Sequence, residues 1–131
     1  MADPTGTWRL VLLDGRPPAA GTRGPVTLTF DGDGVVYGMA GVNRVRATWA
    51  LDEDDRLTLG PVVATLTDGP PQAMETERAL LALLGGPMAL AVDDGGMRLV
   101  GQDGGEALLW PLDQAEAEDA GGFPAGGARQ G

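Results

Sequence analysis

Three reactive side chains are missing from this sequence. The chain of 131 residues contains no Cys and no His, and all nine of its basic residues are Arg. These absences exclude metal sites built from Cys and His, Cys nucleophiles, His general bases and Lys Schiff bases. The groups that remain for chemistry are carboxylates, hydroxyls, Arg and a single Tyr.

Long hydrophobic runs are also missing. A membrane-spanning helix needs roughly 20 consecutive apolar residues, and no run in the sequence approaches that length, so we expect no membrane span. The first residues (MADPTG) form no basic or apolar leader and offer no Cys for lipidation. We therefore expect a cytoplasmic protein, or an exported one if a leader has been removed.

The charge of the chain is one-sided. Asp and Glu number 19 against 9 basic residues, so the formal net charge is −10. An acidic surface repels phosphate backbones, and we therefore expect no nucleic-acid partner. Hydrophobic residues make up 43 %, enough for a modest core, and the length suits a single domain, which we expect to be a monomer.

Short runs of alternating apolar and polar residues, separated by Gly, Pro and Asp, are typical of strands joined by tight turns. Between residues 26 and 30, for example, Val, Leu and Phe alternate with Thr. The pattern predicts eight strands: Thr7–Leu13, Val26–Phe30, Val35–Ala40, Arg44–Leu51, Arg56–Leu59, Met88–Val92, Met97–Val100 and Glu106–Leu112.

One segment, Gln72 to Leu84, has helical spacing instead. Its apolar side comprises Ala73, Thr76, Leu80, Leu83 and Leu84. The preceding residues DGPP offer an Asp or Gly cap, and GGP follows the helix. The predicted fold class is α+β and mostly β: an antiparallel, hairpin-built sheet curling into a partly open barrel of about eight strands, with one helix.

The two ends of the chain differ in composition. Residues 5–112 contain the strand and helix patterns, and we predict that they form one domain. Residues 113–131 are acidic and rich in Gly, with almost no bulky apolar side chain to offset the entropy of ordering. We predict that this tail is disordered.

Several short motifs, taken in order, resemble one known family. They are GTWRLV at 6–11, LTF at 28–30, GMAGVNR at 38–44, LGP at 59–61 with AT at 64–65, METERALL at 74–81, MRLV at 97–100 and ALL at 107–109. Their order and spacing, from Thr5 to Leu112, resemble the META domain family, which includes the heat-inducible bacterial protein HslJ. The resemblance implies a small barrel-like α+β fold and links to heat shock and stress response, with no established enzyme activity, ligand or cofactor.

Two family cysteines are replaced in this chain. The Cys of the family's signature corresponds to Val42, and a second Cys just before the helix aligns near Gly69. In the family this pair can form a disulfide. Its loss fits a chain that stays in a reducing compartment.

Gly38, Gly41 and Asn43, with the neighbouring Tyr37, form the sharpest candidate site. One interpretation is a binding edge at a bend where strands cross. The other is structural, because Gly permits a bend and Asn bonds exposed backbone groups. Tyr37 could line a ligand cavity or belong to the core.

Two acidic segments could in principle hold Ca²⁺. Residues 52–55 (DEDD) and 31–34 (DGDG) carry several oxygens, but their spacing is that of solvated turns and matches no calcium loop. We therefore predict no catalytic residue, no metal and no cofactor.

The sequence predicts a non-enzymatic domain, associated with a stress response, that binds a protein or peptide partner. Two alternatives remain open. One is a carrier of a small apolar ligand inside the barrel. The other is a carboxylate-dependent hydrolase, which requires a cleft holding two acids, at least one of them with a raised pKa.

Overall fold

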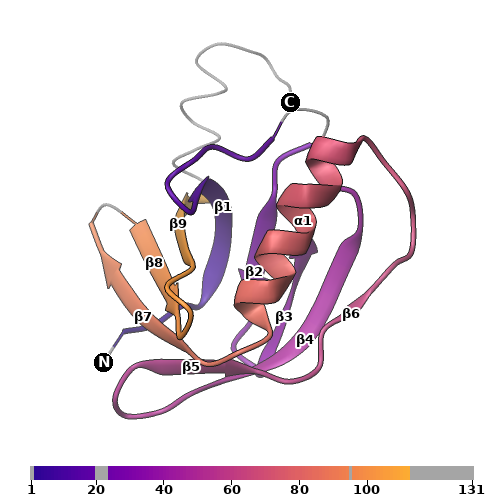
Figure 1. Ribbon diagram of the computed structural model, residues 1–131. Helices are drawn as coiled ribbons and strands as arrows, with labels where there is room; N and C mark the ends of the chain where they lie inside the picture. Colours follow the sequence, from indigo (N-terminus) through magenta and orange to yellow (C-terminus); the bar gives the residue numbers. More distant parts are fainter. Residues whose placement is uncertain (1, 20–23, 95, 113–131) are drawn as a thin grey trace, which may run out of the picture.

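The computed structural model describes residues 2–19, 24–94 and 96–112. Within these residues the chain forms nine strands and one helix (Figure 1): β1 Gly6–Leu13, β2 Thr27–Phe30, β3 Val35–Met39, β4 Arg44–Leu51, β5 Arg56–Leu59, β6 Val63–Ala64, α1 Pro71–Leu84, β7 Met88–Asp93, β8 Gly96–Gly101 and β9 Glu106–Pro111. The tail predicted for residues 113–131 lies outside the described residues.

Eight of the strands close into an antiparallel barrel. Neighbours follow the order β3-β2-β1-β9-β8-β7-β5-β4, and β4 pairs in turn with β3, which completes the ring. The β5–β7 junction is narrow, because it consists of the pairs Arg56–Ala89 and Leu57–Met88. The predicted fold class is therefore confirmed, and the ring of strands is closed.

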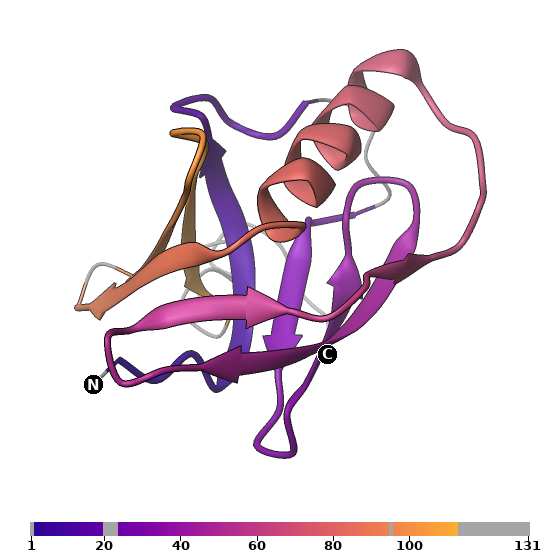
Figure 2. The same ribbon diagram turned by 60° about the horizontal axis from the view of Figure 1, so that its bottom comes forward.

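The helix α1 covers one end of this barrel (Figure 2). Its buried side chains are those of the predicted stripe, with Glu77 in addition. The helix begins at Pro71, with Pro70 as the N-cap and no side-chain hydrogen bond to the cap. The expected Asp or Gly cap is thus wrong, because Pro at the first position fixes φ and lacks the N–H that a cap would satisfy.

The short strand β6 was not predicted, because two residues are too few for alternation to identify. It lies outside the eight strands that the sequence pattern predicts. Val63 pairs with Arg46 and Ala64 with Val45, so β6 lies along the first half of β4, and β5 lies along the second half.

Apolar side chains fill the interior of the barrel. Several are completely buried, with an exposed fraction of 0 %: Phe30, Leu57, Leu80, Met97, Leu99, Ala107 and Leu109. The rings of Phe30 and Trp49 meet edge to face, with their centroids 5.8 Å apart. Strands and helix thus share one core.

Residues 31–34 and 52–55 form turns, as the sequence predicted, and a carboxylate accepts backbone hydrogen bonds in each. Asp31 Oδ1 accepts hydrogen bonds from the N–H groups of Asp33 and Val35, each at 2.9 Å. Asp52 Oδ1 does the same for Asp54 and Arg56, also at 2.9 Å. Among the described residues, no group of three or more His, Cys, Asp or Glu could hold a metal ion.

No helix in the described part of the chain is long and apolar enough to cross a membrane.

Trp8 ties the N-terminal segment to the barrel. Its side chain is 7 % exposed, and its Nε1–H donates to the Pro4 carbonyl oxygen at 2.7 Å. Because truncation leaves a cavity, Trp8→Ala should lower the free energy of unfolding by about 3–5 kcal/mol in urea denaturation. Trp8→Phe keeps most of the apolar volume and should cost clearly less. Equal costs for the two variants would contradict this role for the ring.

Candidate functional site

Gly38 faces inward on β3, where two neighbouring strands approach closely. It lies opposite Leu28 of β2 and Val45 of β4. A Cβ at this position would come within 1.9 Å of the Thr27 carbonyl oxygen. Any larger residue would push β2 and β3 apart, so the glycine is needed by the sheet itself.

Gly41 lies where α1 packs on the turn between β3 and β4. Its φ of +147° is one that side-chain-bearing residues rarely adopt. A Cβ here would lie 3.0 Å from the Ala73 carbonyl oxygen and 3.2 Å from Glu77 Cβ. The absence of a side chain therefore lets the helix contact the turn directly.

The carboxylate of Glu77 joins the helix to this turn. Glu77 is 5 % exposed. Its Oε1 accepts the N–H of Val42 at 3.0 Å and the N–H of Asn43 at 2.6 Å, while Oε2 accepts the Asn43 side-chain amide at 2.7 Å. A buried carboxylate with three donors is well satisfied, which is what makes its burial tolerable.

Asn43 extends the same network to the segment after β6. Its Nδ2 also donates to the Thr67 carbonyl oxygen at 3.0 Å. Its Oδ1 accepts the Thr67 N–H at 2.7 Å and the Thr65 hydroxyl at 2.9 Å. One side chain therefore connects the β3–β4 turn, the helix and the chain that leaves β6.

Burial and hydrogen bonding act on the pKa of Glu77 in opposite directions. Burial raises the pKa, because the charged form loses its water. The hydrogen bonds from the Asn43 side chain and from the N–H groups of Asn43 and Val42 favour the charged form and lower it. The hydrogen bonds prevail, and the pKa of Glu77 lies below its ordinary value of 4.5.

Sequence reasoning singled out Asn43 but missed Glu77, its partner 34 residues along the chain. A signal was present. Glu77 follows Ala73 by four residues and precedes Leu80 by three, which places a charge within the apolar stripe of the helix. Such a charge is rarely buried without a partner.

Val42 and Gly69, at or near which the resemblance places the two cysteines of the family, are neighbours in space. A Cβ built at Gly69 would lie 3.3 Å from Val42 Cβ. The Cβ atoms of a disulfide are about 3.5–4.5 Å apart. The buried side chain of Val42 thus occupies the space that the family's cysteine bridge would use.

Tyr37, the fourth predicted residue, points outward and is 45 % exposed. It lies between Thr29 of β2 and Arg46 of β4. An open hollow of about 430 Å³ is lined there by Thr27, Tyr37, Gly38, Met39, Arg44, Val45 and Arg46. The structure therefore divides the predicted site: Tyr37 and Gly38 border a surface hollow, whereas Gly41 and Asn43 are buried. A binding role for any of the four stays a prediction.

The outer side of the sheet around this hollow has an unusual composition for an acidic protein. The strands β1 to β6 contain no Asp or Glu and four Arg, at positions 9, 44, 46 and 56. We call the part of the outward side of β2, β3, β4 and β6 that surrounds this hollow the arginine face; its side chains are those of Thr27, Thr29, Tyr37, Met39, Arg44, Arg46 and Val63.

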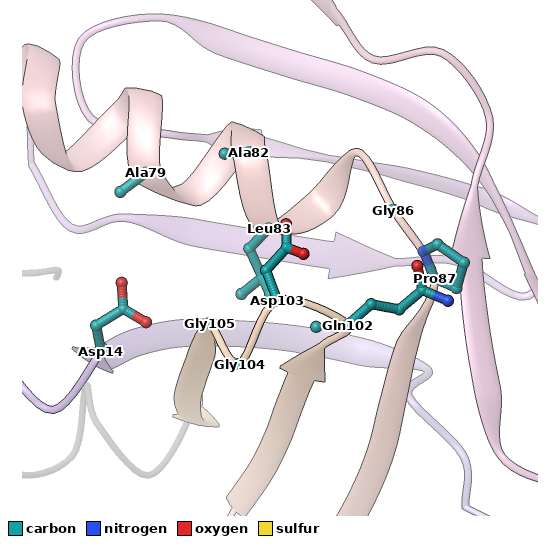
Figure 3. A pocket seen from close by; sticks show the side chains of 11 residues that line it. Asp14, Ala79, Ala82, Leu83, Gly86, Pro87, Gln102, Asp103, Gly104 and Gly105 are labelled. Carbon is teal, nitrogen blue, oxygen red and sulfur yellow. The ribbon is translucent and has the colours of Figure 1, made fainter.

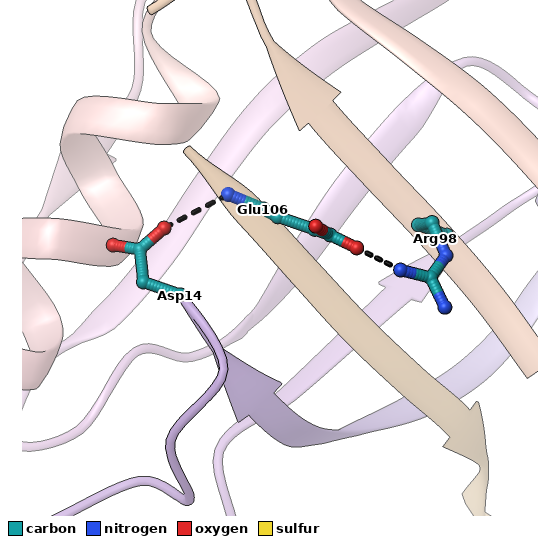
Figure 4. Close-up of polar contacts among 3 residues, drawn as sticks. All are labelled: Asp14, Arg98 and Glu106. Carbon is teal, nitrogen blue, oxygen red and sulfur yellow. Dashed lines mark hydrogen bonds and ion pairs between the residues drawn. The ribbon is translucent and has the colours of Figure 1, made fainter. Parts of the chain in front are cut away.

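A second hollow, of about 450 Å³, lies between the end of α1 and the β8–β9 turn (Figure 3). Asp14 and Asp103 both line it, so two acids share a hollow as the hydrolase alternative requires. Asp14 Oδ1 accepts the N–H of Glu106 at 2.9 Å, and Glu106 forms an ion pair with Arg98 (Figure 4). The first contact joins the end of β1 to β9, and the second joins β8 to β9. The hydrolase alternative stays a prediction.

One void within the described part of the barrel bears on the carrier alternative. A void among Leu28, Val36, Val45 and Leu84 measures about 10 Å³. That is about the space of one water molecule. An apolar ligand there would have to displace core side chains, which gives the carrier alternative no support from the packing.

The lowered pKa of Glu77 gives stability a definite dependence on pH. A carboxyl with a lower pKa in the folded state stabilises that state above its unfolded pKa, and the contribution is lost as the pH falls through the folded pKa. In Glu77→Gln, the new amide N–H₂ group would face the N–H₂ group of Asn43, and two donors cannot bond each other. The substitution should therefore lower the free energy of unfolding by about 1–3 kcal/mol at neutral pH.

In urea denaturation, the difference between wild type and Glu77→Gln should shrink as the pH falls below 4.5. Glu75→Gln is the matched control, because Glu75 is exposed on the same helix. It should show no such difference. A difference for Glu77→Gln that does not change with pH would contradict the proposed network.

The contact between Val42 and Gly69 predicts that a double variant with Val42→Cys and Gly69→Cys forms a disulfide. The bridge should raise the free energy of unfolding by about 3–4 kcal/mol, since it closes a long loop in the unfolded chain. Thiol titration and denaturation with and without reductant measure both effects. Val42→Cys alone should not respond to reductant. Two thiols that stay free under oxidant would show that the positions are not adjacent.

Comparisons with known proteins bear on the identity of the chain. No curated protein matches it at a significant level. An NMR structure of a protein from Burkholderia xenovorans is 26 % identical, with a TM-score of 0.63, over 82 % of this chain and 81 % of that one. A second NMR structure of a protein has a TM-score of 0.70 at 17 % identity, over 87 % of this chain and 98 % of that one, which shows the fold alone. The family model of the META domain matches residues 2–114, and the chain therefore belongs to the META domain family.

Proposed function

We propose that this META domain is a non-enzymatic binding module that holds an acidic segment of a partner protein on its arginine face. The observation that carries the proposal is the open hollow of about 430 Å³ at which Tyr37 lies beside Arg44 and Arg46. The proposal includes the stress-response association implied by the family resemblance, and a cytoplasmic setting.

Charge supports an acidic partner. The chain as a whole carries −10, yet β1 to β6 contain Arg and no carboxylate. Repulsion elsewhere on the surface and attraction at one face together orient an approaching anion. The side chains of Arg44 and Arg46 are both exposed, which leaves them accessible to it.

The apolar side chains on the face favour a polypeptide over a nucleic acid. Tyr37 and Val63 are 45 % and 69 % exposed, and they lie on either side of Arg46 in the strand register. Exposed Tyr beside Arg is the combination that protein interfaces prefer. The acidic turns at residues 31–34 and 52–55 would repel a phosphate backbone that extended past the strands.

The test uses a synthetic peptide in which Glu alternates with Val, the Glu–Val peptide, and a control peptide with Lys in place of Glu. Calorimetric titration of the full chain should show binding of the first, and no binding of the second that depends on Arg44 and Arg46. Arg44→Glu combined with Arg46→Glu should weaken binding by about tenfold or more, because each reversal replaces an attraction by a repulsion. Tyr37→Ala should weaken it as well.

Arg78→Glu is the matched control, because Arg78 is exposed on α1, away from the arginine face. It should bind as wild type does. Loss of affinity to the same degree in Arg78→Glu would mean that net charge, not the face, determines binding. Equal affinity for a single-stranded oligonucleotide would overturn the choice of a polypeptide partner.

A further inference from the structure

The strand β6 ends the sheet with an open edge. It pairs with β4, and it has no second strand neighbour among the described residues. In Figure 1 it lies at the margin of the sheet, where the chain turns away toward α1. Open edges of this kind are places where another chain can add a strand.

The register determines which backbone groups of β6 are available. The N–H of Thr65 donates to the Arg44 carbonyl oxygen at 3.1 Å, and Ala64 lies opposite Val45. In antiparallel pairs, residues bonded to the neighbour alternate with residues whose N–H and C=O point the other way. The N–H and C=O of Ala64 therefore point away from β4, toward the open edge.

Exposed apolar side chains border the same edge. Val63 is 69 % exposed and Leu66 is 99 % exposed. They are two of the four large hydrophobic residues that are exposed in the described part of the chain. Pairing of another strand with this edge would remove apolar surface from water, which favours binding there.

We propose that an extended acidic segment of a partner protein adds to the open edge of β6 as one more strand. This inference rests on the proposed function and specifies how the partner binds. Main-chain bonds would form at Ala64, and the acidic side chains of the segment would lie on the same side of the sheet as Val63 and Arg46. Acidic side chains would reach toward Arg46, which lies two strand spacings, about 10 Å, from the added strand.

A second copy of this chain fits the edge less well than an acidic segment. Pairing of two β6 edges would place Arg44 and Arg46 of both copies on one continuous face, about three strand spacings apart, and like charges at an interface are unfavourable. The chain's net charge of −10 adds a general repulsion between copies. An extended acidic segment avoids the first obstacle, because its carboxylates would attract Arg44 and Arg46 where a second copy would repel them.

The experiment compares the Glu–Val peptide with two N-methylated versions of it. One is N-methylated at every Glu, and the other at every Val. N-methylation removes the donors on one edge of a strand but leaves charge and side chains unchanged. The affinity for the full chain should fall by about tenfold or more for one of the two N-methylated peptides and change little for the other. In the unmodified complex, NMR hydrogen exchange should show new protection at the amide of Ala64.

A variant adds a test from the protein's side. Ala64→Pro removes the outward N–H without removing a bond to β4, so it should weaken binding of the unmodified peptide while circular dichroism stays unchanged.

If the N-methylated peptides both bind normally and the Arg44/Arg46 double variant still weakens binding, strand addition is wrong and the proposed function stands. If neither change affects binding, both are wrong. Protection of the Ala64 amide in the free protein would overturn the inference, because the edge would already be occupied.

Discussion

A buried carboxylate joins the helix of this domain to the turn between β3 and β4. Glu77 is buried, and its two oxygens accept three hydrogen bonds from Val42 and Asn43. A buried charge without such donors would be costly, and the donors without the charge would be left unsatisfied. Gly41 completes the arrangement, because a side chain there would meet the helix.

The same network determines where the arginine face ends. Asn43 bonds Thr65 and Thr67, so the chain after β6 is held against the turn from which β4 begins. This places Val63 beside Arg46 and leaves the far edge of β6 open. Gly41 and Asn43 are thus buried contacts that support the surface next to them, and a binding role for the predicted site stays a prediction.

Much of the fold could be predicted from the sequence, because alternation and acidic turns are local signals. The pairing of Asn43 with Glu77 could not, since 34 residues separate them and only the closed barrel brings them together. β6 is too short for alternation to mark it. Tyr37 was identified as a candidate, but the acid-free face around it depends on which strands are neighbours, and a strand's own sequence does not specify its neighbours.

The most direct test of the central role of Glu77 is an acid titration of the full chain by NMR. It would follow the Glu77 carboxyl carbon and the amide protons of Val42, Asn43 and Thr67 in one sample. We expect the carboxyl to titrate below 4.5, and the three amides to shift over the same pH range. A carboxyl that titrates at or above that value, or amides that do not respond to it, would contradict the view that this carboxylate joins helix, turn and β6.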